Sequence, residues 1–226
     1  MISKSIFKAY DIRGVIGKTL DTDAARSIGR AFGSEVRAQG GDAVVVARDG
    51  RLSGPDLIAA LSDGLRAAGV DVVNVGMVPT PVGYFAASVP LKLAGGERRV
   101  DSCIVVTGSH NPPDYNGFKM VLRGAAIYGE QILALHQRIV DENFAEGSGT
   151  YTEYDIADAY LDRIVSDIKL ARPLKIVVDT GNGVAGGLAP KLFKKLGCEL
   201  VELFTEIDGN FPNHHPDPAH PENLQD

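Results

Sequence analysis

Short apolar runs rich in β-branched residues alternate with longer amphipathic stretches, and this alternation restricts the possible folds more than any other feature. The runs AVVVAR (43–48), VDVVNVG (70–76) and CIVV (103–106) are nearly continuous, as is typical of strands covered on both faces. Stretches 22–40 and 54–69 have apolar residues at helical spacing, and each ends on a glycine. This order predicts an α/β fold with mixed, mostly parallel sheets and flanking helices.

The pattern starts again in the second half of the chain. A predicted helix at 130–144 is followed by AEGSGT (145–150), the best candidate for a linker. The pattern then predicts a helix at 156–168, a strand at 174–181, a second helix at 184–197 and a second strand at 198–204. We expect a complete first domain at 1–147 and an incomplete second domain at 148–226, because two strands make a thin core. The chain is therefore expected to be a fragment.

Composition limits the classes of partner. The formal net charge of −6 argues against nucleic acid, because proteins that bind it usually present a basic face. No stretch approaches the roughly 18 apolar residues of a membrane span. The N-terminus lacks the apolar core of a signal peptide, so we expect a cytoplasmic protein. Cys103 and Cys198 lie in strand-like runs and are expected to be structural thiols.

The most polar loop of the chain, TGSHNPPDYNGFK (107–119), directly follows a predicted buried strand. Ligands bind at the carboxyl ends of parallel strands, which makes Ser109 a candidate nucleophile or group carrier. Adjacent side chains usually diverge, so His110 is expected to serve the ligand rather than to deprotonate Ser109. Asn116 and Gly117 are predicted to form a tight turn that brings Lys119 back into the loop. The loop is typical of a phosphate site.

Two other polar stretches carry arginines. AYDIRG places Tyr10, Asp11 and Arg13 near the N-terminus, and RDGR follows the first apolar run. The planar guanidinium group suits phosphate and carboxylate. We favour a functional role for Arg13, whereas Arg48 and Arg51 remain open between phosphate binding and structural ion pairs.

These stretches resemble those of a known family. The loop 107–119 closely resembles the phosphoserine loop of the α-D-phosphohexomutases, and FKAYDIRG (7–14) resembles the N-terminal signature of their phosphomannomutase/phosphoglucomutase branch. The resemblance continues through RDGR, VVDTGNGVAG (177–186) and DGNFPNHHPDP (208–218), and thus covers essentially the whole chain.

The resemblance implies an isomerase that transfers a phosphoryl group between the 1- and 6-positions of mannose or glucose phosphate. Ser109 would be the phosphoserine, and a hexose 1,6-bisphosphate would be intermediate and activator. His110, Lys119 and Arg13 would be catalytic. The resemblance further implies that Tyr10, Asn111 and Arg13 line the substrate site.

The resemblance also implies Mg²⁺, bound in part by the phosphate on Ser109. The family's aspartate metal loop, sugar-recognition loop and distal phosphate loop do not occur in this sequence. The remaining metal ligands are therefore expected beyond residue 226, because Mg²⁺ usually needs more than one anionic group. On this hypothesis the chain alone binds metal weakly and is inactive.

Three alternatives deserve comparison. GNGVAG (181–186), with Glu202 about twenty residues on, fits the outline of a dinucleotide fingerprint and would indicate an NAD(P)-binding Rossmann oxidoreductase. A serine hydrolase using Ser109 is disfavoured, because the sequence around it is not G-x-S-x-G. The histidine-rich stretch 213–222 is a weak candidate for a transition-metal site.

Overall fold

The apolar runs of the first half form the centre of a mixed sheet in the computed structural model, which describes residues 2–225. The strands of this seven-stranded sheet are β1 (Ile12–Val15), β2 (Ala43–Arg48), β3 (Asp71–Met77), β6 (Cys103–Val106), β7 (Tyr115–Leu122), β8 (Ala125–Ala126) and β9 (Tyr151–Glu153). Their order is β1-β7-β6-β2-β3-β9, with β8 on β7. Strand β2 pairs in parallel with β3 and β6, whereas β7 is antiparallel to both β6 and β1. The predicted fold class is confirmed.

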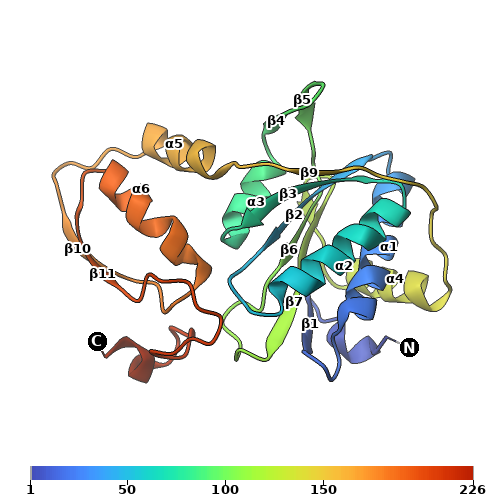
Figure 1. Cartoon of the computed structure of the whole chain (residues 1–226), viewed down its shortest axis with the longest axis horizontal. Coiled ribbons are helices and arrows are strands. Elements are labelled where there is room, and N and C mark those ends of the chain that lie inside the picture. Colours follow the sequence, from blue (N-terminus) through green and yellow to red (C-terminus); the bar gives the residue numbers. More distant parts are fainter. Residues whose placement is uncertain (1, 226) are drawn as a thin grey trace.

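Helices cover both faces of this sheet (Figure 1). On one face lie α1 (Thr22–Ala38), α2 (Gly54–Ala67) and α4 (Glu130–Val140), packed on alternate residues of the strands. On the other face lies α3 (Thr80–Ala86), packed on the intervening residues. Both core clusters are built from aliphatic side chains withdrawn from water, which is the main favourable term in folding. Helix α1 is capped by Asp21, whose Oδ1 accepts from Ala24 N at 2.8 Å.

Helices α1 and α2 pack closely because glycines lie at their contact. A Cβ atom at Gly29 would lie 2.3 Å from the carbonyl oxygen of Leu61, and one at Gly64 would lie 2.1 Å from that of Arg26. Any larger residue at either position would push the helices apart and open the core between them.

The segment proposed as a linker is held against the first unit. Gly147 N donates to Ala67 O at 3.0 Å, Gly149 N to Arg66 O at 2.9 Å, and Ala145 N to Ser34 Oγ at 2.8 Å. The chain then adds β9 to the edge of the sheet beside β3. Residues 151–153, which the sequence groups with the second unit, thus pair with the first sheet.

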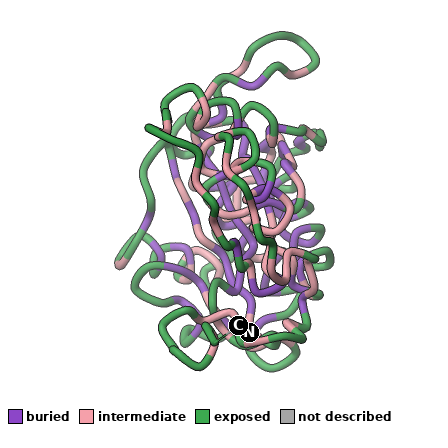
Figure 2. The backbone as a smooth tube through the Cα atoms, turned by 90° about the vertical axis from the view of Figure 1, so that its left-hand side faces the viewer, coloured by how far each residue is buried: buried purple, intermediate pink, exposed green. Residues whose placement is uncertain are grey.

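The second unit is smaller and more open. It contains α5 (Ala157–Asp167), β10 (Lys175–Asp179), α6 (Ala189–Lys195) and β11 (Glu199–Leu203), and the two strands pair in parallel. The single helix predicted over 184–197 is divided into a 3₁₀ turn, η2 (Val184–Gly187), and the short α6. Val177 and Val201 remain 63% and 41% exposed. In Figure 2 the second unit faces the viewer and is mostly exposed (green) or intermediate (pink), whereas the buried chain (purple) lies mainly behind it in the first unit.

Four short elements complete the structure. A hairpin of β4 (Pro90–Leu93) and β5 (Gly96–Arg99) projects from the first unit, as Figure 1 shows. The 3₁₀ turns η1 (Lys4–Ile6) and η3 (Pro221–Leu224) lie near the two ends of the described chain. No helix within residues 2–225 has the length and apolar character needed to cross a membrane.

The two cysteines should differ sharply in reactivity. Cys103 is fully buried, and this burial raises the pKa of its thiol far above the usual range, whereas Cys198 is partly exposed. Because the thiolate is the nucleophile, iodoacetamide at pH 8 should label Cys198 in the folded protein and leave Cys103 unmodified. Peptide mass spectrometry measures both, with urea-unfolded protein as the control in which both react. Equal labelling of the two in the folded protein would contradict the buried placement of Cys103.

Candidate active site

Ser109 lies just beyond the carboxyl end of β6 and has an unusual backbone conformation. It is exposed, and its φ of +53° lies in the left-handed region. For a residue with a side chain this conformation costs about 1–2 kcal/mol and persists only where the surroundings impose it. Ser109 N donates to Thr107 Oγ1 at 2.9 Å, which fixes one side of the residue. Backbone strain of this kind is found preferentially at functional sites.

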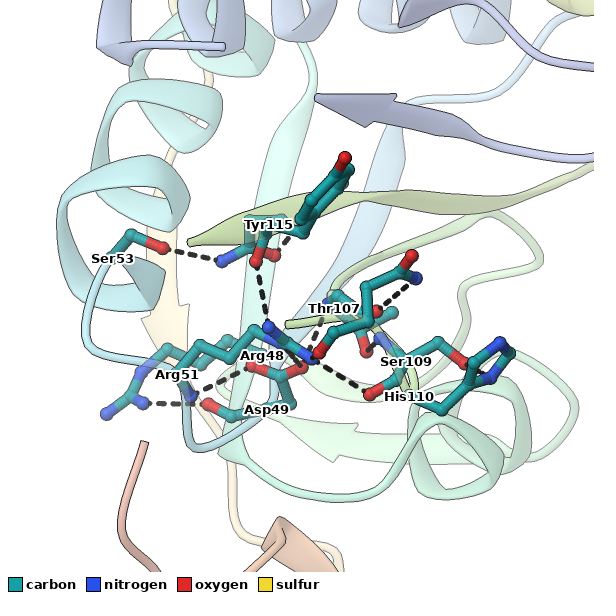
Figure 3. Close-up of polar contacts among 12 residues, drawn as sticks. Arg48, Asp49, Arg51, Ser53, Thr107, Ser109, His110 and Tyr115 are labelled. Atoms are coloured by element: carbon teal, nitrogen blue, oxygen red, sulfur yellow. Dashed lines mark hydrogen bonds and ion pairs between the residues drawn. The ribbon is translucent and has the colours of Figure 1, made fainter. Parts of the chain in front are cut away.

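Ser109 and His110 face each other. Ser109 Oγ lies 3.2 Å from His110 Nδ1 (Figure 3), so the expectation that the two side chains diverge is wrong. The left-handed conformation of Ser109 interrupts the extended backbone in which successive side chains alternate. The imidazole is therefore within hydrogen-bond reach of the candidate reactive oxygen, where it can exchange a proton.

Three charged side chains from two distant parts of the sequence meet beside the loop. Arg13 Nη2 donates to Asp11 Oδ2 at 2.7 Å, and Lys119 Nζ lies 3.5 Å from the same oxygen. Arg13 also reaches Asn111 Oδ1 at 3.5 Å, and Asn111 Nδ2 donates to Gly108 O at 2.8 Å. Both cations are thus connected through neighbouring polar groups to the loop at residues 107–115, called the Ser109 loop below.

The pairing of β1 with β7 produces this cluster. Arg13 is opposite Gly117, and Lys119 lies two residues further along β7 on the same face. Ile12 and Phe118 point to the opposite face and are fully buried in the core. Period-two alternation therefore directs the cations away from the helices α1, α2 and α4.

The predicted turn at Asn116 and Gly117 is wrong. Both residues belong to β7, and Asn116 Nδ2 donates to Ser53 Oγ at 2.9 Å. The chain reverses earlier, where Tyr115 N donates to Pro112 O at 3.0 Å. Lys119 is accordingly a strand residue, which holds its ammonium group more firmly than a loop would.

The sequence pattern around Asp11 does not predict a role for this residue. Its side chain is only 9% exposed, and its carboxylate is the shared partner of Arg13 and Lys119. A buried carboxylate needs such partners, and it also reduces the repulsion between the two cations. In the sequence, Asp11 lies between Tyr10 and Arg13, two candidate site residues, and this position could have indicated that it belongs to the site. Tyr10 itself is 79% exposed, so its predicted contact with substrate stays a prediction.

The two arginines of RDGR have different surroundings. Arg48 Nη1 donates to Asp49 O at 3.0 Å, whereas Arg51 is 1% exposed and donates to four backbone carbonyls of the Ser109 loop. Burial lowers the pKa of Arg51, and the nearby Asp49 carboxylate opposes that shift. Both Nη groups of Arg51 are therefore engaged within the protein, and its Nε is buried 3.4 Å from Asp49 Oδ2, so Arg51 is not placed to bind an external phosphate.

The residues present do not by themselves form a magnesium site. Among the carboxylates beside the loop and its cations, Asp11 is paired with Arg13 and Lys119, and Asp49 accepts from two backbone N–H groups. In the described chain, no cluster of three or more His, Cys, Asp or Glu side chains has the geometry of a metal site. A phosphate on Ser109 would thus be one ligand among others that these residues do not supply.

The other two candidate motifs lie in the second unit and make contacts within it. A Cβ at Gly181 would lie 2.8 Å from His214 Cε1, and one at Gly186 would lie 2.0 Å from Thr205 O. Because these glycines of GNGVAG have no side chain, other residues of the second unit can pack directly against them. In the histidine-rich stretch, His214 pairs with Asp179 at 3.1 Å and His220 with Glu222 at 3.3 Å, so these two histidines have separate partners.

Solved structures with the same fold place the chain in the phosphohexomutase class. A crystal structure of a phosphoglucomutase/phosphomannomutase family protein from Burkholderia thailandensis is 84% identical, with a TM-score of 0.98 over 100% of this chain and 49% of that one. A putative phosphomannomutase from Thermus thermophilus is 26% identical, with a TM-score of 0.80 over 100% of this chain and 51% of that one.

Family models specify the class further. Residues 4–146 match alpha/beta/alpha domain I of phosphoglucomutase/phosphomannomutase, and residues 158–226 match domain II. The chain therefore belongs to the phosphoglucomutase/phosphomannomutase family. The oxidoreductase alternative is not supported.

Curated relatives agree with the family. The phosphomannomutase/phosphoglucomutase of Pseudomonas aeruginosa is 54% identical over 98% of this chain and 46% of its own length. The phosphoglucomutase of Neisseria gonorrhoeae is 53% identical over 100% of this chain and 48% of its own length. The chain thus spans about half the length of these relatives.

Proposed function

We propose that residues 1–147 are the first domain, and residues 148–226 the beginning of the second, of a longer phosphomannomutase/phosphoglucomutase. The full protein would interconvert the 1- and 6-phosphates of glucose or mannose. Support comes from the family matches to domains I and II in that order and from the names of relatives about half identical to this chain.

The observation that carries this proposal is the placement of Ser109. The residue is exposed, its Oγ lies 3.2 Å from His110 Nδ1, and it belongs to a loop connected through Asn111 to Arg13. A phosphoryl group on Oγ would enter a site with a proton carrier and nearby cations. Phosphoryl transfer depends mainly on such positioning and charge stabilisation.

In the first half-reaction, a hydroxyl oxygen of the hexose monophosphate attacks the phosphorus on Ser109. The bond from phosphorus to Ser109 Oγ breaks as the new P–O bond forms. The hydroxyl proton is lost, and Ser109 Oγ gains one, for which His110 is a suitable carrier. The product is a hexose 1,6-bisphosphate. In the second half-reaction, Ser109 Oγ loses its proton and attacks the phosphorus of the other phosphoryl group. The bond from that phosphorus to the sugar oxygen breaks, and the sugar oxygen takes up a proton, which leaves phosphoserine and the isomeric hexose monophosphate.

Lys119 and Arg13 would offset the negative charge on the transferring group. Their shared partner Asp11 keeps both at fixed positions, at 2.7 Å from Arg13 Nη2 and 3.5 Å from Lys119 Nζ. Asp11 is therefore a positioning residue in this mechanism. Mg²⁺ would contribute further charge neutralisation, held by the phosphate on Ser109 and by carboxylates beyond residue 226.

The direct test is an assay of the full-length protein with glucose 1-phosphate and mannose 1-phosphate, Mg²⁺ and a hexose 1,6-bisphosphate. We expect the corresponding 6-phosphates to form, with EDTA suppressing turnover. The ratio of kcat/KM for the two sugars measures the preference between them. Release of inorganic phosphate and free sugar without isomerisation would contradict the proposal.

A further inference from the structure

Arg51 occupies an unusual position for a charged residue, directly beneath the Ser109 loop. Its side chain is 1% exposed, and Figure 3 shows it directed into the loop. Nη2 donates to Ser109 O at 3.0 Å and to Asn111 O at 2.6 Å, and Nη1 donates to Tyr115 O at 3.0 Å and to Pro112 O. One side chain thus holds four carbonyls within a short stretch of backbone.

These bonds fix the conformation of Ser109 itself. Arg51 holds the carbonyl group of Ser109, and Thr107 Oγ1 holds its N–H group at 2.9 Å. The preceding peptide is also held, because Gly108 N donates to Asp49 Oδ2 at 3.0 Å. The unfavourable φ of +53° at Ser109 is therefore imposed by hydrogen bonds on both sides of the residue.

Asp49 and Arg51 act as a unit. Asp49 Oδ1 accepts from Arg51 N at 3.0 Å, and its Oδ2 lies 3.4 Å from Arg51 Nε. The ring of Phe211 lies 5.2 Å from the guanidinium carbon, so the second unit contributes to the enclosure of this charge. A buried cation is tolerated when most of its donors are satisfied and an anion lies nearby. Here both Nη groups donate to carbonyl groups, while Nε makes no hydrogen bond within the described chain and relies on the nearby Asp49 carboxylate.

Arg51 lies so close to the loop that there is no space for a side chain at residue 108. A Cβ atom there would lie 2.2 Å from Arg51 Nε and 2.3 Å from its guanidinium carbon. The glycine thus allows the guanidinium group to lie directly against the backbone of the loop. Lysine would not replace this arrangement, because its three donors radiate from one nitrogen and cannot match a planar set of acceptors.

We propose that Arg51, together with Asp49, is a positioning residue that holds the Ser109 loop in its reactive conformation and does not itself bind phosphate. The consequence for catalysis rests on the proposed function, in which Ser109 carries the phosphoryl group. Without the four carbonyl bonds, the loop loses the restraint that keeps Ser109 Oγ beside His110 and near the cation cluster.

The kinetic test is Arg51→Lys in the full-length enzyme. We expect kcat to fall by about 10-fold or more, because a small misplacement of a reacting group is costly, while KM changes by less than about 3-fold. Gly108→Ala should have the same effect with Arg51 intact, because the added methyl group displaces the guanidinium. Arg37→Lys is the matched control, since Arg37 donates to Ala68 O and Glu146 O in another part of the first unit.

Hydrogen–deuterium exchange separates this role from a general loss of stability. Peptides covering residues 107–116 should exchange at least about 5-fold faster in Arg51→Lys and Gly108→Ala, while peptides from α1 and α2 keep their wild-type rates. Unchanged loop exchange, equal acceleration throughout the first unit, or an unchanged kcat would overturn the proposal. This readout needs no catalytic activity. If wild-type protein failed to isomerise hexose phosphates while loop exchange still responded, the proposed function would fail and the loop-holding role would stand.

Discussion

Replacing Ser109 with alanine in the full-length enzyme should lower kcat by more than about 10³-fold, because no other side chain would carry the phosphoryl group between the two half-reactions. The exposed position of Ser109 at the end of β6 leaves room for an added phosphate. Intact-mass analysis of the wild-type enzyme after incubation with a hexose 1,6-bisphosphate should show a species about 80 Da heavier, the mass of one phosphoryl group. The variant should lack that species.

Ser166→Ala is a suitable control, because Ser166 is an exposed serine of α5 that donates to Arg163 O. It should keep both the added mass and the turnover. Equal phosphorylation of wild-type and Ser109→Ala proteins would place the phosphoryl group on another residue and refute the assignment of Ser109.

Replacing Lys119 with methionine should lower kcat by roughly 10²-fold, the usual effect of removing one group that stabilises charge in a transition state. Methionine retains much of the aliphatic stem of lysine, and Asp11 keeps its 2.7 Å bond with Arg13. The fold should therefore persist, as circular dichroism and thermal unfolding would verify. Arg13→Met should give a loss of similar size but also destabilise the protein, because Arg13 is the closer partner of the buried Asp11.

Lys195→Met is the matched control, because Lys195 also pairs with an aspartate, Asp162 at 2.7 Å, but on the surface of the second unit. Surface pairs contribute little, so its turnover should match wild type. An unchanged kcat in Lys119→Met would show that Lys119 is only the structural partner of Asp11, and the charge-stabilising role would be abandoned.

Local patterns in the sequence were enough to predict most of the elements. The apolar run 43–48 is observed as β2 with the same bounds, and the helix expected at 54–69 is observed as α2. These predictions hold because side-chain periodicity and helix-ending glycines act over a few residues. The family resemblance likewise depended on contiguous motifs, which remain recognisable without coordinates.

Strand β7 was misread as a loop for a physical reason. Asn116 and Lys119 are polar, but both belong to a strand next to the candidate active site. Lys119 points to the face where the cation cluster forms, and Asn116 is buried with Ser53 as its hydrogen-bond partner. Polar side chains of the candidate site stand where apolar residues would normally indicate a strand. Such conflicts between local pattern and fold are expected at functional sites.

The sequence by itself determined the α/β class, the core-forming runs and the identity of Ser109 as the candidate reactive residue, because each depends on residues close together in the chain. Only the tertiary structure decided how the site is held. Asp11 and Lys119 are 108 residues apart, and Arg51 lies 58 residues from the Ser109 carbonyl that it binds. Contacts at such separations depend on which strands pair and in what register, and no local pattern specifies that pairing.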